Sequence, residues 1–208
     1  MSHPFDRGAT IPQPGEIDEK LNEFWVDSPW KIQNSHNLSA FERNRTFLNV
    51  SGRHFVEISY LAGTDSDGDG RSVVAADFKN NGQPDLVVRQ VGGGSLLLYE
   101  NRFPKRHYLK VSLRGTQSNR LGIGARLIAR VGDRQIVREL FPVNSFRSQM
   151  PSHVLFGLGD ADNVDSLSIR WPSGQEQELT NLAADRHVVV EEASDQVETV
   201  VPGQVIAP

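Results

Sequence analysis

Residues 118–179 read SNRLGIGARLIARVGDRQIVRELFPVNSFRSQMPSHVLFGLGDADNVDSLSIRWPSGQEQEL. Three short pieces of this stretch, SNRLGIGAR, FGLG and WPSG, place glycines and polar residues at the ends of apolar runs. Glycine adopts the backbone conformations that tight turns and bulges require, and proline and serine favour turns as well. Such residues specify the path of the backbone rather than a catalytic centre. The stretch therefore predicts strands joined by tight turns.

Apolar and polar residues alternate in the runs between those turns. In residues 125–131 every odd-numbered position is apolar, whereas Arg126 and Arg130 fall on the opposite face. Residues 107–113 and 165–171 alternate in the same way. A period of two with one apolar face is typical of antiparallel sheets that pack on one side only. We therefore expect an all-β domain, an antiparallel β-sandwich.

The first half of the chain shows short strand patterns as well. Five apolar or alternating runs, TFLNV, HFVEIS, SVVAADF, DLVVRQ and SLLLYEN, are separated by SG, DGDG, NNGQP and VGGG. Runs at such short spacing, with turn residues between them, are typical of a meander, a sandwich or a propeller blade. Before them, residues 15–26 place Ile17, Leu21, Phe24 and Trp25 near helical spacing, which predicts one short N-terminal helix.

Composition excludes several classes of protein. The 208 residues carry a net charge of −4, and 38% of them are hydrophobic. This charge is too small and mixed to indicate a nucleic-acid partner. Cysteine is absent, so neither disulfides nor thiolate metal sites are expected. We expect no membrane span, since no window holds about 20 apolar residues. The sequence as given also starts without the apolar segment of a signal peptide.

Two acidic segments have the oxygen ligands that calcium prefers. In the first, Asp65, Asp67 and Asp69 alternate ahead of Gly70. An EF-hand loop would carry Glu at its twelfth position, where Ala76 stands. This segment is therefore half a motif, and an ordinary solvated turn rich in Asp and Gly remains the alternative to a metal loop.

The second segment is residues 77–85, DFKNNGQPD, with Asp77, Asn81 and Asp85 at its first, fifth and ninth positions. It resembles the nine-residue calcium loop of FG-GAP/VCBS repeats, D-x-[DN]-x-[DN]-G-x-x-D. Lys79 departs from that pattern, because it stands where the third position carries Asp or Asn. We expect a degenerate calcium loop that binds the ion weakly or not at all. Alternatively, the Lys79 ammonium takes the place of the ion and pairs with Asp77 and Asp85.

The second half of the chain resembles a known domain over several blocks in order. These blocks are HYLKVSLRG, SNRLGIGARLIARVGDRQIVREL and SQMPSHVLFGLGDADNVDSLSIRWPSGQEQEL. Together they resemble the ASPIC/UnbV domain. Residues 45–101 resemble the FG-GAP/VCBS blade that precedes this domain in, for example, the cartilage acidic protein group. A full propeller needs several blades, and this sequence has material for one or two.

The resemblance implies a division of the chain and a setting. We expect a lead with a short helix at 1–40, a blade at 41–104, an ASPIC/UnbV-like β domain at 105–192 and a mobile tail at 193–208. The resemblance implies an extracytoplasmic or secreted protein that contacts protein or glycan. It transfers no catalytic residue.

Individual motif residues admit structural and functional interpretations. Asn119 and Arg120 form a polar corner that either caps its loop or contacts a ligand, and Arg126 is a further candidate for ligand contact. His153 has no second histidine at metal-ligand spacing, which favours a structural or surface role. Four arginines could converge on Asp77 or Asp85 to join blade and cap: Arg45, Arg71, Arg120 and Arg126.

The sequence leaves three functions open, since it contains no P-loop, nucleophile elbow or zincin helix. The first is a non-catalytic binding or adhesion module of a secreted or cell-surface protein, contacting protein or glycan. The second is an accessory or catalytic domain of a biosynthetic enzyme, which predicts a deep pocket with convergent titratable groups. The third is a structural cap that assembles with further propeller blades.

Overall fold

The computed structural model describes residues 43–68, 70–90 and 95–201. All helical or extended elements assigned within this part of the chain are β-strands, which confirms the all-β prediction. The predicted helix at 15–26 and the carboxylate of Asp69 lie outside the described residues. The chain divides into two compact units: residues up to Val73 with Val87–Tyr99, and Val74–Leu86 with residues from Glu100 onward.

The first unit is built on short strands. β1 (Phe47–Val50) and β2 (His54–Glu57) form an antiparallel ribbon whose turn holds Ser51 and Gly52 at φ of 56° and 70°. A three-stranded sheet has the order β3-β4-β5 and comprises β3 (Gly70–Ala76), β4 (Asp85–Gln90) and β5 (Leu97–Tyr99). The end of β3, residues 74–76, and the start of β4, residues 85–86, belong to the second unit. All five predicted strands of the first half of the chain are thus present.

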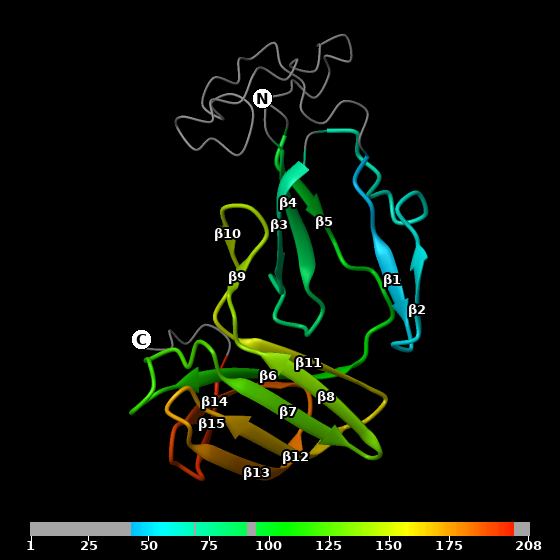
Figure 1. The fold of residues 1–208 in the computed structure, drawn as a ribbon. Coiled ribbons are helices and arrows are strands. Elements are labelled where there is room, and N and C mark those ends of the chain that lie inside the picture. The colour runs from blue at the N-terminus through cyan, green and yellow to red at the C-terminus, as the bar shows by residue number, and fades with distance from the viewer. Residues whose placement is uncertain (1–42, 69, 91–94, 202–208) are drawn as a thin grey trace, which may run out of the picture. The chain divides into compact units, whose positions relative to one another are not determined.

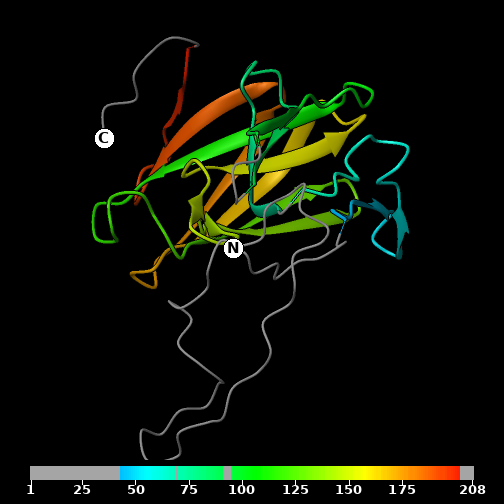
Figure 2. The ribbon, with the colours of Figure 1, turned by 90° about the horizontal axis from the view of Figure 1, so that it is seen from above.

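The second unit contains a sandwich of two four-stranded sheets (Figure 1 and Figure 2). The first sheet has the order β11-β6-β14-β15. It comprises β6 (His107–Arg114), β11 (Val154–Gly159), β14 (Arg186–Glu191) and β15 (Val197–Thr199). The second sheet has the order β13-β12-β7-β8. It comprises β7 (Arg126–Val131), β8 (Arg134–Glu139), β12 (Asn163–Arg170) and β13 (Glu176–Ala183). A small hairpin of β9 (Val143–Asn144) and β10 (Ser148–Gln149) stands between β8 and β11 in the chain.

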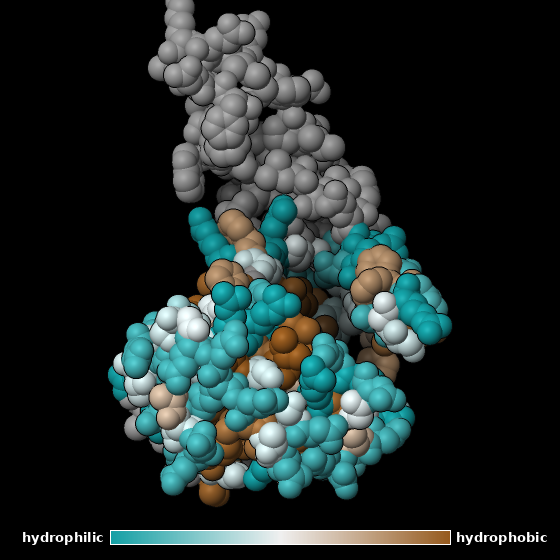
Figure 3. All heavy atoms as spheres, turned by 60° about the horizontal axis from the view of Figure 1, so that its bottom comes forward, coloured by the Kyte–Doolittle hydropathy of each residue, from teal (hydrophilic) through white to brown (hydrophobic). Residues whose placement is uncertain are grey.

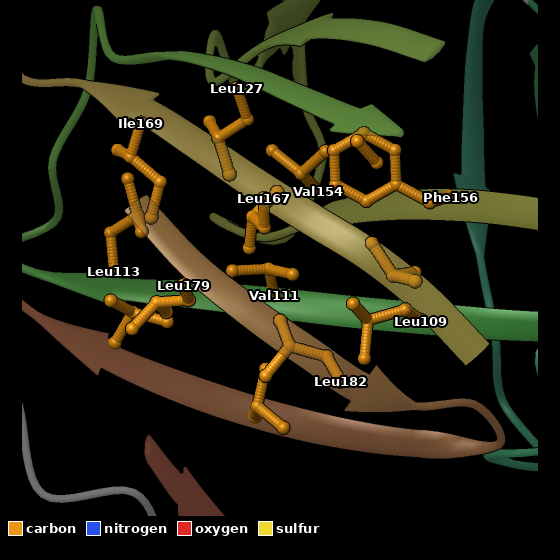
Figure 4. Close-up of a cluster of buried hydrophobic side chains, with 14 of the residues drawn as sticks. Leu109, Val111, Leu113, Leu127, Val154, Phe156, Leu167, Ile169, Leu179 and Leu182 are labelled. Atoms are coloured by element: carbon orange, nitrogen blue, oxygen red, sulfur yellow. The ribbon is translucent and has the colours of Figure 1, made fainter. Parts of the chain in front are cut away.

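One hydrophobic core lies between the two sheets (Figure 4). On β6 the residues Leu109, Val111 and Leu113 are at most 5% exposed, as their predicted shared face requires. Alternation on β7 and β12 fills the opposite side of the core, where Leu127 and Leu167 are fully buried. The period-two pattern therefore decided correctly which face of each strand is buried, because successive side chains of a strand point to opposite faces.

The glycine and proline motifs of the second half form turns and a bulge. In WPSG, the Gly174 amide donates to the carbonyl of Trp171 over 2.9 Å and closes the turn. Trp171 is buried, and its indole Nε1 donates to Oε1 of Gln177 over 2.8 Å. In FGLG, the pairing of β11 with β6 shifts between Gly157 and Gly159, which is the predicted bulge.

The structure differs from the sequence-based prediction at β14 and β15. β14 pairs with β6 in parallel, although an antiparallel sandwich was expected, while the other pairings of the sandwich are antiparallel. The central residues of β14 are all buried, so its sequence HVVVE lacks the alternation that marks a half-exposed strand. β15 pairs with β14 inside segment 193–208, for which the sequence predicted a mobile tail without strands.

Gly122 adopts a left-handed conformation at a crowded position. Its φ is +65°, and a Cβ there would lie 2.7 Å from Cβ of Leu113 and 3.3 Å from the ring of Trp171. Any other residue would therefore suffer backbone strain and a clash with the core at the same time.

We expect Gly122→Ala to lower the free energy of unfolding by about 2–4 kcal/mol, as measured by urea denaturation. Gly132→Ala is the matched control, because Gly132 has φ of +55° but nothing within 4 Å of its added Cβ. That control should cost only about 1 kcal/mol, for backbone strain alone. Equal losses in the two variants would mean that contact with Leu113 contributes nothing.

Candidate functional site

The segment from Asp77 to Gly82 covers the outer face of β6. Tyr108 and Lys110 point away from the core of the sandwich, yet they are only 8% and 3% exposed. Gly82 lies flat against the ring of Tyr108, at φ of +80°, and a Cβ there would overlap that ring. The predicted calcium loop is thus packed on the sheet rather than suspended in solvent.

Lys110 meets the first residue of this loop. Its Nζ lies 2.9 Å from Oδ2 of Asp77, and the two side chains are 4% and 2% exposed. Burial alone would raise the pKa of Asp77, but the hydrogen bond from Lys110 and those from the amides of Asn81 and Gly82 lower it. The sequence suggested that arginines would gather on Asp77 or Asp85, whereas the cation beside Asp77 is this lysine.

The other loop positions point elsewhere. Lys79 pairs with Glu100, and this pair raises the pKa of Lys79, so its ammonium does not take the predicted place between Asp77 and Asp85. Asp85 is buried, and its Oδ1 accepts the Asn101 amide over 2.8 Å. Within the described ranges no three His, Asp or Glu side chains gather as a metal site would need. A degenerate calcium loop at Asp77, Asn81 and Asp85 stays a prediction from the sequence.

In the acidic segment of residues 65–69, one carboxylate likewise pairs with a cationic side chain. Asp65 pairs with Arg43 across 2.9 Å at a partly exposed position. Asp67 lies in the described loop, and Asp69 does not belong to the described residues. Calcium binding here remains a prediction from the sequence.

Two histidines lie together on the outer face of the first sheet, which the sequence did not predict. The rings of His153 and His187 are 5.8 Å apart in an edge-to-face arrangement, and Nε2 of His187 lies 2.8 Å from Oγ of Ser112. Burial, with help from the nearby Lys110 charge, lowers the pKa of each histidine to about 4. Both rings are therefore neutral at pH 7.

A cavity of about 210 Å³ opens beside this pair. It is lined by Asp77 and His153 together with apolar residues that include Leu140, Phe141 and Met150. The sequence associated a deep pocket with the enzyme hypothesis. Arg138 and Glu139 also line this cavity, while Asp77 is already bonded to Lys110 and the imidazole of His153 is held neutral.

The predicted polar corner splits into two residues with different roles. Asn119 spans its turn, because its Nδ2 donates to the carbonyl of Ile123 over 2.7 Å and its Oδ1 accepts the Ile123 amide over 2.9 Å. Arg120 is exposed, and its backbone carbonyl accepts the Gly115 amide. Asn119 thus caps its turn, and ligand contact by Asn119 or Arg120 stays a prediction.

The carboxylate of Glu192 accepts hydrogen bonds from the loop that contains Asn119. Its Oε2 accepts the backbone amides of Thr116, Gln117 and Ser118 over 2.7–2.8 Å. Its Oε1 accepts the hydroxyls of Ser118 and Ser173 over 2.8 and 2.5 Å. Consecutive amides that converge on one point form an anion-binding concavity, here filled by a carboxylate of the same chain. The residue is only 2% exposed.

These hydrogen bonds decide the charge of Glu192. Burial alone would raise the pKa of its carboxyl group, but the bonds from Ser118, Ser173 and Thr116 outweigh burial and lower it from 4.5 to about 2. Glu192 is therefore ionised at neutral pH, and no salt bridge joins it to a cation of the described residues.

Arg126 lies on the outer face of the second sheet, directly opposite Arg170 on β12. A groove of about 480 Å³ runs past both arginines, with Ser168, Glu176 and Glu178 on its walls. Hydrophilic residues cover most of the sandwich face that comes forward in Figure 3. The groove is where a ligand contact by Arg126 would occur.

The Glu192 cluster joins the loop after β6 to the end of β14. Residues 115–197 match the family model described as ASPIC and UnbV. No curated protein matches the chain. The ASPIC/UnbV match includes the Asn119 corner, the arginine groove, Glu192 and most of the sandwich core. In the described part of the chain, no helix has the length and apolar character that crossing a bilayer requires.

We expect Glu192→Gln to lower the free energy of unfolding at pH 7 by about 1–3 kcal/mol, because the neutral amide replaces a charged acceptor of several hydrogen bonds. Because the folded-state pKa is depressed, this stability is complete above about pH 4.5 and is lost as the pH falls toward about 2. Urea denaturation between pH 2 and 7 measures the change.

The variant Glu191→Gln is the control, because Glu191 is half-exposed in a surface pair with Arg114. It should change stability by less than about 1 kcal/mol and keep the loss of stability in acid. If Glu192→Gln retained the full wild-type acid profile, the amide cluster would not be its source.

Asn119→Ala tests the corner. We expect a loss of about 1–2 kcal/mol in thermal or urea unfolding, because two hydrogen bonds across the turn disappear. Arg120→Ala should leave stability within about 0.5 kcal/mol. A comparable loss in both variants would contradict the division between a capping Asn119 and an exposed Arg120.

Proposed function

We propose that this protein is a non-catalytic binding module of an extracytoplasmic protein and that its partner is a protein bound by the first unit. One observation carries the proposal: all buried hydrophobic residues in the described part of the chain lie between Tyr108 and Val190. The extracytoplasmic setting rests on the similarity to the ASPIC/UnbV family.

Large apolar residues of the first unit are exposed instead. Tyr60 and Leu61 are 84% and 85% exposed, and other exposed members of this set are Phe47, Leu48, Phe55, Val56, Val73, Leu96 and Leu98. Several large exposed apolar side chains in one unit favour protein–protein contact, because covering each of them gains about 1.5–3 kcal/mol. A protein partner explains this exposure better than a glycan, which offers less apolar surface to cover it.

The sheet β3-β4-β5 gives that partner a second means of attachment. β5 is an edge strand of the three described strands, and Leu96 and Leu98 are exposed along it. An edge strand presents unpaired backbone groups to which another strand can add. We infer that the partner supplies β-structure to this edge.

A second candidate function follows from the same edge. Residues 41–104 resemble an FG-GAP/VCBS blade, and further blades would provide the sheet that covers the apolar residues. In this alternative the module is a structural cap of a propeller. The enzyme alternative would have to use the cavity beside Asp77 and His153, and the glycan alternative the groove beside Arg126.

The proposal is tested with the triple variant Phe55→Ser, Leu61→Ser and Leu98→Ser, which removes apolar surface from the first unit. A matched variant, Phe103→Ser with Leu121→Ser, removes exposed apolar residues from the second unit. Cross-linking with mass spectrometry on native secreted material identifies the partner and the residues that it touches. We expect the triple variant to lose at least tenfold in captured partner and the matched variant to lose none.

Equal capture by both variants would contradict a partner site on the first unit. Cross-links to other copies of the same kind of blade would favour the structural cap. Binding on a glycan array that Arg126→Ala abolishes would favour the glycan alternative. All variants should keep the unfolding midpoint of the sandwich, since exposed positions change stability by about 0.5 kcal/mol or less.

A further inference from the structure

The loop of residues 77–85 places a carboxylate where calcium loops of its pattern bind their ion, and a lysine from another strand meets that carboxylate. Nζ of Lys110, on β6, lies 2.9 Å from Oδ2 of Asp77 and 3.4 Å from Oδ1 of Asn80. Asp77 and Lys110 stand 33 positions apart in the chain. Folding therefore brings this lysine to the loop, because it is not part of the loop's own sequence.

Both oxygens of Asp77 are engaged at this point. Oδ1 accepts the amide of Asn81 over 3.0 Å, and Oδ2 accepts the amide of Gly82 over 2.9 Å in addition to the ammonium. A calcium ion needs six to eight oxygen ligands with free lone pairs directed at it. Here the Gly82 amide and the Lys110 ammonium take both lone pairs of Oδ2, and the ammonium adds a positive charge at the oxygen that an ion would need.

The remaining loop positions do not converge on Asp77. The side chain of Lys79 is turned to Glu100, and Asp85 accepts the amide of Asn101. Among the described residues, the hydrogen bonds given for the Asp77 carboxylate come from the loop amides and Lys110. The Lys110 ammonium compensates its charge, and a divalent ion there would be repelled by that ammonium.

We propose that the ammonium of Lys110 replaces the divalent cation of the loop, so that residues 77–82 are fastened to β6 by an internal ion pair without calcium. The loop keeps the shape of its pattern because Gly82 still packs on Tyr108 and the amides of Asn81 and Gly82 still bind Asp77. Removal of Lys110, with a carboxylate restored at position 79, then creates a divalent-cation site.

The experiment compares wild type, Lys79→Asp, Lys110→Met and the double variant Lys79→Asp/Lys110→Met, with calcium chloride as the probe. Isothermal titration and the thermal unfolding midpoint are the two readouts. We expect wild type and Lys79→Asp to show no calcium-dependent rise of the midpoint. The double variant should bind one calcium at least tenfold more tightly than either single variant and unfold at a higher temperature when calcium is present.

Lys110→Met in the absence of calcium should lower the unfolding midpoint, because it leaves the buried Asp77 carboxylate without a cation. The matched control is Lys105→Met, since Lys105 is an exposed lysine that should tolerate the change. One calcium bound to wild type with a rise in midpoint would overturn the proposal. Binding by Lys79→Asp as tight as by the double variant would also overturn it.

A second measurement serves if the double variant does not fold. In the cycle of Asp77→Asn, Lys110→Met and the two changes combined, the combined variant should lose less stability than the sum of the single losses, because each single change leaves one partner unpaired. Strict additivity would show that Lys110 does not compensate Asp77 and would overturn the proposal. None of these readouts depends on a binding partner of the first unit.

Discussion

The buried, ionised carboxylate of Glu192 is the constraint on which the loop architecture of the sandwich depends. Hydrophobic burial assembles the two sheets, but it is non-directional and does not decide the path of the connections. A carboxylate without water must receive hydrogen bonds, and Glu192 receives them from three consecutive loop amides and two serine hydroxyls. The amides fix the loop after β6, and Ser173 fixes the WPSG turn. A single charge at the end of β14 thereby sets the conformation of two motifs that are distant in sequence.

Asp77 meets the same requirement in a different way. Its carboxylate is buried against β6 and receives two loop amides and one ammonium. The ammonium belongs to Lys110, an outward-facing residue of β6. Its charge can be buried only because it is paired. The second unit thus contains two buried carboxylates: among the described residues, Glu192 is held by hydrogen bonds, whereas Asp77 also pairs with a cation. The difference matters for metal binding, since only the second arrangement already contains a positive charge where an ion would lie.

The sequence predicted the buried faces of individual strands well, but it predicted contacts between residues that are distant in sequence poorly. Alternation identified the buried faces of β6, β7 and β12, because a strand's own period determines which side chains share a face. It missed β14, whose three valines show no alternation since both faces are covered. Lys79 was the nearest cation to the acidic loop in sequence, yet Lys110 is the one that reaches it. Nothing in the local sequence distinguishes Glu192 from its half-exposed neighbour Glu191. The contact between His153 and His187 likewise forms only when β11 and β14 join the same sheet.

The unequal burial of apolar residues in the two units bears on function more directly than any polar motif. The sandwich closes over its own core, where the largest buried side chains, including Trp171 and Phe156, are sealed. Residues 47–61 and 96–98, by contrast, include eight large apolar side chains that are exposed. Such exposure is costly, so a chain that retains it gains most when another protein surface covers it. We therefore infer that the sandwich is stable by itself and that the first unit is the part of the protein that a partner binds.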